Sequence, residues 1–204
     1  MDLIKIKDIQ PRTILDIGAH FGWFHTLAKG VWPEAHIYMI DANENVLDML
    51  KAIENGKYTI QLLGDEEKEV DFYTTKEDKY CSGHSIYREN TEHYSDDNLI
   101  VEKKQMSTLD NIFEPYAVFD LIKIDTQGSE VDIMEGGKEL CQRAKYIILE
   151  VSVEEYNKGA PLKDDVMTYM DKIGFTQLEV LGKPHPVQED IIFINKKLVG
   201  GFPW

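Results

Sequence analysis

Short apolar runs alternate with amphipathic segments along most of the chain. Thr13–Ile17 is apolar and ends just before a glycine, which predicts a buried strand followed by a turn. Apolar positions at helical spacing predict a helix over Asn43–Glu54, which Gly56 ends. The same patterns predict strands at 36–40, 58–63, 119–124, 146–151, 175–181 and 190–195, and helices at 22–31, 130–140 and 164–173. Strands that alternate with helices imply right-handed crossovers, and the sequence therefore predicts an α/β fold with a parallel sheet.

The end and the middle of the chain depart from this alternation of strands and helices. The last two strands are joined by GKPHPVQE, which is too short for a crossover helix, so they should form an antiparallel hairpin. Val70–Thr74 alternates as an exposed strand does, and Lys76–Asn98 is polar, tyrosine-rich and aperiodic. A long loop of this kind is either functional or disordered, and a lid or substrate loop is one of the two readings. We expect one domain over residues 1–204 with a polar loop insertion at about 76–98.

Composition narrows the class of protein. A chain of 204 residues fits one α/β domain, and 37 acidic against 22 basic residues give a net charge of −15. Such an acidic surface repels phosphate backbones, so we expect no nucleic-acid partner. No segment has the roughly 18 apolar residues of a membrane span, so no membrane association is expected. Cys81 and Cys141 define no disulfide framework. These features predict a soluble protein of a reducing compartment, the cytoplasm.

The first predicted turn, DIGAHFG at Asp16–Gly22, is a candidate ligand site. Gly18 permits a tight turn and a close approach of a ligand to the backbone. Asp41 follows 23 residues later at the end of the second strand, at the sheet edge where such folds bind ligands. Its carboxylate can accept both ribose hydroxyls of an adenosine, or it can cap the helix that follows.

Two adenosine cofactors use this geometry, and the turn favours one of them. A nicotinamide dinucleotide needs glycine where this chain has His20, because its pyrophosphate lies against bare backbone. S-adenosylmethionine has no phosphate and tolerates a side chain there. Asp16 suits a cationic ligand end better than a pyrophosphate, and the terminal hairpin is not needed by dinucleotide folds. The sequence therefore predicts S-adenosylmethionine at Asp16–Gly22.

Two carboxylates are the candidates for catalysis. Asp125 ends the fourth strand of the sheet, and Glu150 lies near the exit of the fifth. Neighbouring strands are about 4.8 Å apart, so the two side chains can converge, and the pKa of one should then rise. Either carboxylate could serve as a general base or a metal ligand. Alternatively, both could be structural, with Asp125 hydrogen-bonded to the turn that follows it and Glu150 hydrogen-bonded to nearby backbone groups. With only two ligands evident we expect a metal-free base, and the histidines show no zinc spacing.

Seven segments carry a resemblance to a known family. In chain order they are DIGAHFG at 16–22, IDANE at 40–44, GHSIYREN at 83–90, STLD at 107–110, DLIKIDTQGSEVDIMEGG at 120–137, ILEVS at 148–152 and QEDIIFIN at 188–195. The chain resembles FkbM-type methyltransferases, within the class I S-adenosylmethionine-dependent fold. The resemblance spans nearly the whole chain, and DLIKIDTQGSE is its most diagnostic part. The family more often has Asn at the place of His20.

The resemblance implies a Rossmann-like sheet of seven strands, S-adenosylmethionine as methyl donor and a hydroxyl acceptor on a sugar or another small molecule. By family position Asp65 contacts the adenine amine, although with Glu66 and Glu67 beside it a solvated acidic turn is the equal alternative. The expected cofactor-binding residues are Asp16, Gly18, Ala19, His20, Phe21, Gly22, Asp41, Ala42 and Asp65, and the expected catalytic residues are Asp125 and Glu150. The rival functions are a catalytically silent cofactor-binding module and an N-methyltransferase.

Overall fold

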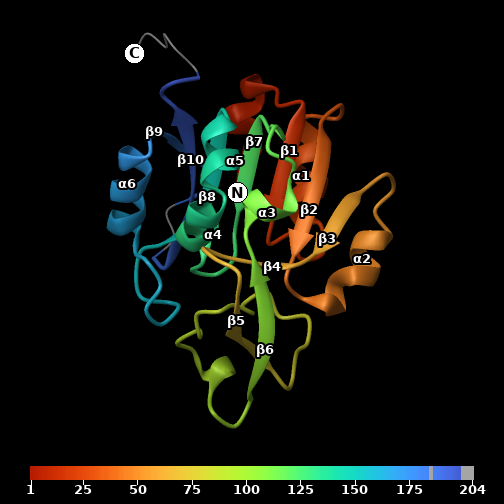
Figure 1. Cartoon of the computed structure of the whole chain (residues 1–204), viewed down its shortest axis with the longest axis vertical. Coiled ribbons are helices and arrows are strands. Elements are labelled where there is room, and N and C mark those ends of the chain that lie inside the picture. Colours follow the sequence, from red (N-terminus) through yellow and green to blue (C-terminus); the bar gives the residue numbers. More distant parts are fainter. Residues whose placement is uncertain (184–185, 199–204) are drawn as a thin grey trace.

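A seven-stranded sheet forms the centre of the computed structural model, which describes residues 1–183 and 186–198. Its spatial order is β3 (Lys57–Ile60), β2 (His36–Asp41), β1 (Thr13–Ile17), β7 (Leu121–Ile124), β8 (Tyr146–Ser152), β10 (Gln188–Asn195) and β9 (Phe175–Val180) (Figure 1). Every pair is parallel except those of β10, which runs antiparallel to β8 and β9. The expected fold class is confirmed, although the loop between β9 and β10 includes residues 184–185, which lie outside the described part.

Helices cover both faces of this sheet (Figure 1). One buried apolar cluster includes Ile14 of β1 and Phe24 of the helix α1, and the other includes Leu15 of β1 and Ile133 of the helix α4. Successive side chains of a strand point to opposite faces, which explains why Ile14 and Leu15 belong to different clusters. Outside residues 76–98, the helical elements are η1 (Leu3–Ile9), α1 (Trp23–Val31), η2 (Glu44–Val46), α2 (Leu47–Lys51), α3 (Leu109–Ile112), α4 (Glu130–Gly136), α5 (Lys138–Arg143) and α6 (Lys163–Lys172).

Two of the expected helices are interrupted. The segment expected to be one helix over 130–140 breaks at Gly137 into α4 and α5. At the neighbouring Gly136, an added Cβ would lie 1.9 Å from the carbonyl oxygen of Gly64, so only glycine permits this approach of two backbones. The segment over 43–54 starts as the 3-10 turn η2 and continues as the short helix α2.

The strand expected over 58–63 is divided between two sheets, which corrects that expectation. β3 ends at Ile60, and β4 (Leu62–Leu63) pairs instead with β6 (Leu99–Ser107) in a second sheet of order β4-β6-β5. β5 (Lys68–Thr75) is the strand expected around 70–74, whereas β6 was not expected. Its central residues, EKKQ, are polar because they lie on an exposed pair of strands, and this hides the alternation on which strand prediction depends.

The β5–β6 pair forms an arm that projects from the carboxyl edge of the main sheet (Figure 1). Residues 76–98 connect the two strands and contain a 3-10 turn, η3 (Glu92–Tyr94), in which Tyr94 is fully buried. Ser85 pairs with Tyr73 of β5 through two backbone hydrogen bonds. The connection therefore folds back along the arm toward the main sheet. Its role as a lid stays a prediction.

Nothing in the described ranges resembles a membrane-spanning helix. A search of the helices over residues 1–183 and 186–198 found none with the length and apolar character needed to cross a bilayer.

Candidate functional site

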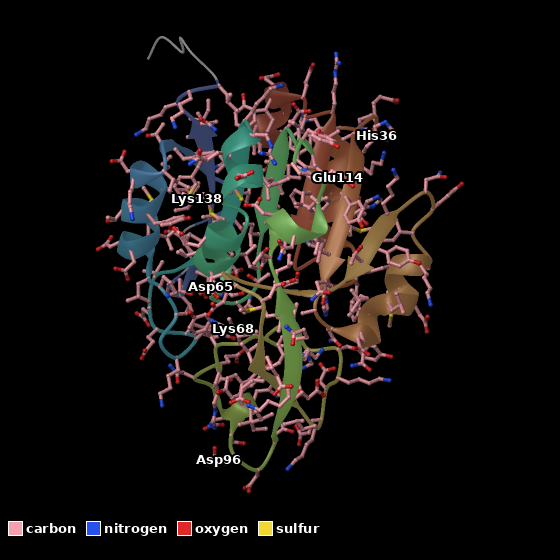
Figure 2. The ribbon with its side chains drawn as sticks, viewed as in Figure 1. His36, Asp65, Lys68, Asp96, Glu114 and Lys138 are labelled. Atoms are coloured by element: carbon pink, nitrogen blue, oxygen red, sulfur yellow. The ribbon has the colours of Figure 1, made fainter. Side chains whose placement is uncertain are left out.

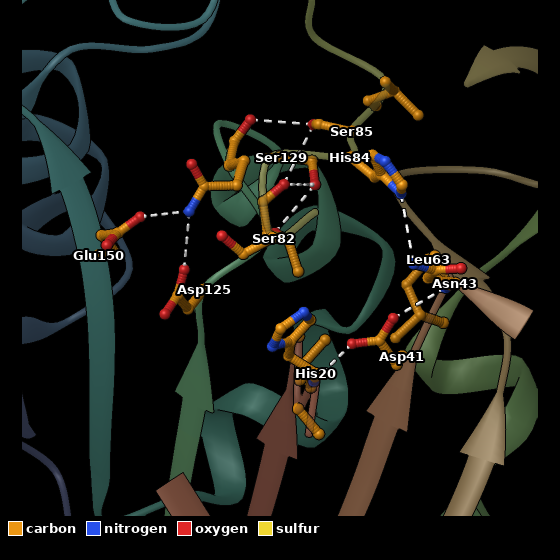
Figure 3. Close-up of a pocket in the computed structure, with 18 of the residues that line it drawn as sticks. His20, Asp41, Asn43, Leu63, Ser82, His84, Ser85, Asp125, Ser129 and Glu150 are labelled. Atoms are coloured by element: carbon orange, nitrogen blue, oxygen red, sulfur yellow. Dashed lines mark hydrogen bonds between the residues drawn. The ribbon is translucent and has the colours of Figure 1, made fainter. Parts of the chain in front are cut away.

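A cavity of about 490 Å³ lies where the parallel strands end and the arm connection returns (Figure 3). Its walls come from the turns after β1, β2 and β7, from β4, β5 and β8, and from residues 81–86 and Glu89 of the connection. Ligands of open α/β sheets bind at this edge, and the volume lies within the range of small-molecule sites. Of the expected site residues, the cavity is lined by Gly18, Ala19, His20, Asp41, Ala42, Asp125 and Glu150.

The turn after β1 is shaped by its neighbour β7. Gly18 has a φ of +77°, and a Cβ added to it would lie 1.8 Å from the carbonyl oxygen of Asp125. Glycine is therefore required here by the tight turn and by the meeting of two backbone segments, and its contact with a ligand stays a prediction. His20 also has a positive φ, of +48°, and its ring nitrogen Nε2 lies 2.6 Å from the carbonyl oxygen of Tyr80 in the arm connection.

Asp41 joins the two turns that flank it. Its Oδ2 accepts a hydrogen bond of 2.7 Å from the backbone N–H of His20, and its Oδ1 accepts one of 2.8 Å from that of Asn43. Burial raises the pKa of Asp41, and the two N–H donors oppose that rise. Each carboxylate oxygen can accept a second hydrogen bond. Because Asp41 lines the cavity, it both organises the turns and has capacity left for a ligand.

A buried ion pair lies beneath the turns, and the sequence analysis missed its cation. Lys123 of β7 is 4% exposed, and its Nζ lies 3.1 Å from Oδ2 of Asp125 and 3.5 Å from Oδ1 of Asp16. Burial lowers the pKa of Lys123, but the two carboxylates outweigh burial and raise it above its usual value. Burial raises the pKa of Asp16 to about 6 although Lys123 opposes it. Asp16 and Lys123 are register partners on adjacent strands, and a lysine within an apolar strand was the signal.

Asp125 and Glu150 come together as expected. Gln127 bridges them, since its Nε2 donates to Oδ1 of Asp125 at 3.1 Å and to Oε2 of Glu150 at 2.7 Å (Figure 3). Gln188 of β10 donates to the same Glu150 oxygen at 2.8 Å. Burial and then the Asp125 charge raise the pKa of Glu150 far above its usual range. Burial also raises the pKa of Asp125, but the Lys123 charge and the hydrogen bonds of this carboxylate together outweigh burial and lower it. The pair therefore consists of a carboxylate, Asp125, and a protonated acid, Glu150.

The arm connection is fastened to both halves of the site. Ser85 Oγ donates to the carbonyl oxygens of Thr126 at 3.1 Å and Gln127 at 2.9 Å, in the turn after β7. On the other side, Asn43 Nδ2 donates to the carbonyl oxygen of Lys79 at 2.8 Å. The turn after β7 is itself held by Glu130, a buried carboxylate that accepts from the backbone N–H of Thr126 at 2.8 Å. The sequence indicated a long polar connection that is either functional or disordered, with a resemblance to the family at 83–90, but it gave none of these contacts.

Several expected ligand residues lie away from the cavity wall. Asp65 is exposed at the base of the arm, where its carboxylate lies 3.1 Å from the ammonium of Lys68 (Figure 2). Phe21 is exposed, and a Cβ added to Gly22 would lie 2.4 Å from Ile53, so this glycine serves packing. Asp16 does not line the cavity, but it pairs with Lys123, which does. No group of three His, Cys, Asp or Glu side chains that could hold a metal ion occurs within the described ranges.

Comparisons with known proteins agree with this architecture. A family model described as the methyltransferase FkbM domain matches residues 16–176. The 2-O-methyltransferase NoeI of Sinorhizobium fredii is 35% identical over 80 residues, which are 39% of this chain and 31% of NoeI. The structure of the methyltransferase FkbM from Methylobacillus flagellatus KT matches with a TM-score of 0.57 and 15% identity, over 90% of this chain and 44% of that one. A SAM-dependent methyltransferase from Aquifex aeolicus matches with a TM-score of 0.50 and 15% identity, over 95% of this chain and 87% of that one. This chain thus spans less than half of the first two proteins.

Proposed function

Because this chain belongs to the family of the methyltransferase FkbM domain, we propose that it transfers the methyl group of S-adenosylmethionine to a hydroxyl group of a small molecule or a glycan. The observation that carries the proposal is one cavity lined both by Asp41, at the turn expected to bind adenosine, and by the Asp125–Glu150 pair. The description of NoeI as a 2-O-methyltransferase supports oxygen as the acceptor atom.

The residues of the cavity fit this donor. Asp41 retains hydrogen-bonding capacity for a ribose diol, and the cavity volume of about 490 Å³ suits a ligand of this class. Asp41, Asp125 and Glu89 line the cavity, and the surplus of carboxylates suits a sulfonium cation. Bound there, S-adenosylmethionine would supply an electrophilic methyl group.

The chain's own residues would place and deprotonate the acceptor. Asp125 is held in one position by Lys123 and Gln127, so its carboxylate can accept the proton that a hydroxyl group loses as its oxygen takes the methyl group. Glu150, as a protonated acid beside it, limits repulsion within the pair. Ser85 holds the arm connection over the same turn. Fixing the acceptor oxygen in line with the methyl group contributes through orientation.

Replacing Asp41 with alanine should weaken the binding of S-adenosylhomocysteine, the product of the donor. We expect a loss of about 1.5–3 kcal/mol, the range for a hydrogen bond to a charged group, as measured by titration calorimetry. Asp48→Ala is a matched control, because the side chain of Asp48 is exposed on α2 and pairs with Lys51 at 3.4 Å. NADH should not bind either protein. An Asp41→Ala protein that binds the product as the wild type does would remove Asp41 from the donor site.

The charge of the cavity predicts a preference among acceptors. Asp41, Glu89 and Asp125 line it, and the ammonium of Lys123 is already paired with Asp16 and Asp125. Like charges brought together across a contact cost several kcal/mol, so an uncharged acceptor should be favoured over an anionic one. We expect kcat/KM for a methyl glycoside to exceed that for its phosphorylated form by at least about tenfold. The reverse preference would contradict the assignment of this cavity to the acceptor.

The proposed activity can be tested directly. A panel of sugars, glycosides and small phenols is incubated with the full chain and methyl-labelled S-adenosylmethionine, and the products are identified by mass spectrometry. Label on a carbon-bound oxygen supports the proposal, and label on nitrogen identifies an N-methyltransferase. Binding of S-adenosylhomocysteine without transfer to any acceptor of the panel would favour the silent binding module.

A further inference from the structure

A buried carboxylate, that of Glu130, holds the turn that carries Gln127. Glu130 begins α4, is 6% exposed and does not line the cavity. Its Oε1 accepts a hydrogen bond of 2.8 Å from the backbone N–H of Thr126, and its Oε2 accepts one of 3.1 Å from that of Gly128. These two residues flank Gln127 in the chain. One carboxylate therefore fixes the backbone before and after Gln127.

The turn needs this support because the backbone of Gln127 is left-handed. Its φ is +58°, in a region that residues other than glycine rarely adopt, and such a conformation persists only where the surroundings hold it. Glu130 binds the N–H groups of the turn, and Ser85 binds its carbonyl oxygens. In the conformation so fixed, the side-chain amide of Gln127 reaches both Asp125 and Glu150 (Figure 3).

The charge of Glu130 matters because both of its oxygens face N–H donors. A carboxylate accepts from several donors at once, whereas a protonated carboxyl group turns one oxygen into a donor and sets it against an N–H group. Burial raises the pKa of Glu130 to about 7, although the backbone donors of the turn oppose this rise. The ionisable groups that face Glu130 from other elements are Asp125 at the end of β7, Glu150 of β8 and Tyr87 of the arm connection.

We propose that Glu130 is a positioning residue for methyl transfer, whose carboxylate holds Gln127 between Asp125 and Glu150. The inference rests on the proposed function, since it takes Asp125 as the base. When Glu130 loses its charge, one N–H of the turn loses its acceptor, and Gln127 leaves the position from which it donates to Oδ1 of Asp125 and Oε2 of Glu150. Asp41 lies in another turn, so the donor site is unaffected. The rate of transfer falls while the affinity for the donor stays the same.

Glu130→Gln keeps the shape of the side chain and removes its charge. At pH 8.5 we expect kcat to be about tenfold below that of the wild type, the effect of one lost hydrogen bond, measured in single turnovers with labelled donor. Titration calorimetry should give an affinity for S-adenosylhomocysteine within about twofold of the wild type. Glu139→Gln is the matched control, because the side chain of Glu139 is exposed on α5, and it should have the wild-type kcat.

The pH profile of kcat separates positioning from a general loss of structure. Wild-type kcat should fall by about fivefold from pH 8.5 to pH 6, as Glu130 takes up a proton. The pKa of Asp125 is lowered away from this range and that of Glu150 is raised above it, so neither titrates here. Because Glu130→Gln has no charge to lose, its kcat should change by less than about twofold over the same range.

A measurement without turnover supplies a second readout on the unaltered chain. Spectra of ¹⁵N and ¹H follow the backbone N–H groups of Thr126 and Gly128 and the side-chain amide of Gln127 from pH 5.5 to 8.5. All three signals should shift with one midpoint near pH 7, because Glu130 binds the first two groups and positions the third. In Glu130→Gln this common shift should be absent.

The outcomes distinguish this inference from the proposed function. A wild-type pH profile in Glu130→Gln would assign the titration to another group, such as Asp16, whose pKa is about 6, and would overturn the role of Glu130. A Gln127 amide that does not shift together with Thr126 and Gly128 would also overturn it, and both results leave the function standing. No methyl transfer by the wild type would overturn the proposed function and the effect on kcat, and the spectra would still decide whether Glu130 positions Gln127.

Discussion

Replacing Lys123 with methionine is expected to lower the free energy of unfolding by about 3–5 kcal/mol, the cost of removing one partner of a buried ion pair. The substitution leaves Asp16 and Asp125 facing each other in the interior without the cation that lies 3.5 and 3.1 Å from them. Urea denaturation followed by circular dichroism measures the loss. Lys145→Met is the matched control, because Lys145 also pairs with an aspartate, at 2.8 Å, but is exposed and should cost less than about 1 kcal/mol.

The deficit of Lys123→Met should grow with pH. Burial already raises the pKa of Asp16 to about 6, and removing Lys123 raises it further, so the folded variant holds protons that the unfolded chain has released. Stability falls with rising pH wherever the folded state binds more protons, and the loss should therefore be larger at pH 8 than at pH 5. Adding Asp16→Asn to Lys123→Met should recover part of the stability. A loss equal to that of Lys145→Met at both pH values would show that the ion pair does not stabilise the fold.

Replacing Asp125 with asparagine is expected to lower kcat by about 10²–10⁴-fold, the contribution of a positioned general base. The binding of S-adenosylhomocysteine should stay nearly unchanged, because the donor is assigned to Asp41 and the turn after β1. Single-turnover measurements with labelled donor give the rate, and calorimetry gives the affinity. We expect the same turnover in the presence of EDTA, and a loss that Mg²⁺ restores would instead assign the Asp125–Glu150 pair to a metal site.

Glu150→Gln is the companion to this experiment. The raised pKa of Glu150 favours its protonated form, and an amide can reproduce the bonding of that form, with the oxygen accepting from Gln127 and Gln188 and the NH₂ donating to Asp125. Its kcat should fall by less than about tenfold, as for a positioning residue. Equal losses in both variants would mean that the two carboxyl groups share the proton. A fully active Asp125→Asn protein would leave orientation alone to explain the rate.

The main sheet could be predicted because its strands are buried on both faces. Thr13–Ile17 and residues 119–124 are apolar at most positions, and the strand ends then place Asp41, Asp125 and Glu150 at one edge without any tertiary information. The terminal hairpin followed from loop length alone. Sequence periodicity is informative wherever burial imposes it.

What could not be predicted lies where partners come from distant parts of the chain. β6 is half exposed, and its EKKQ run shows no apolar alternation. The change of sheet between Ile60 and Leu62 depends on pairing with Met106 and Ser107, which no local pattern encodes. Gln127 acquires its bridging position from a φ of +58° in the turn after β7.

The pairing of Asp16 with Lys123 also bears on how the chain matures during synthesis. The two residues are adjacent in the sheet but more than 100 residues apart in the chain. At about 5–20 residues per second, a ribosome delivers Lys123 roughly 5–20 seconds after Asp16. Until then β1 can pair with β2, but the Asp16 carboxylate of β1 has no cation beside it. Burial of the edge of β1 that later pairs with β7 is therefore disfavoured. The β5–β6 arm, whose strands are close in sequence, can form in the interval. The nascent protein should therefore expose one open edge of β1 until β7 emerges, which is the stage at which chaperones would have most to bind.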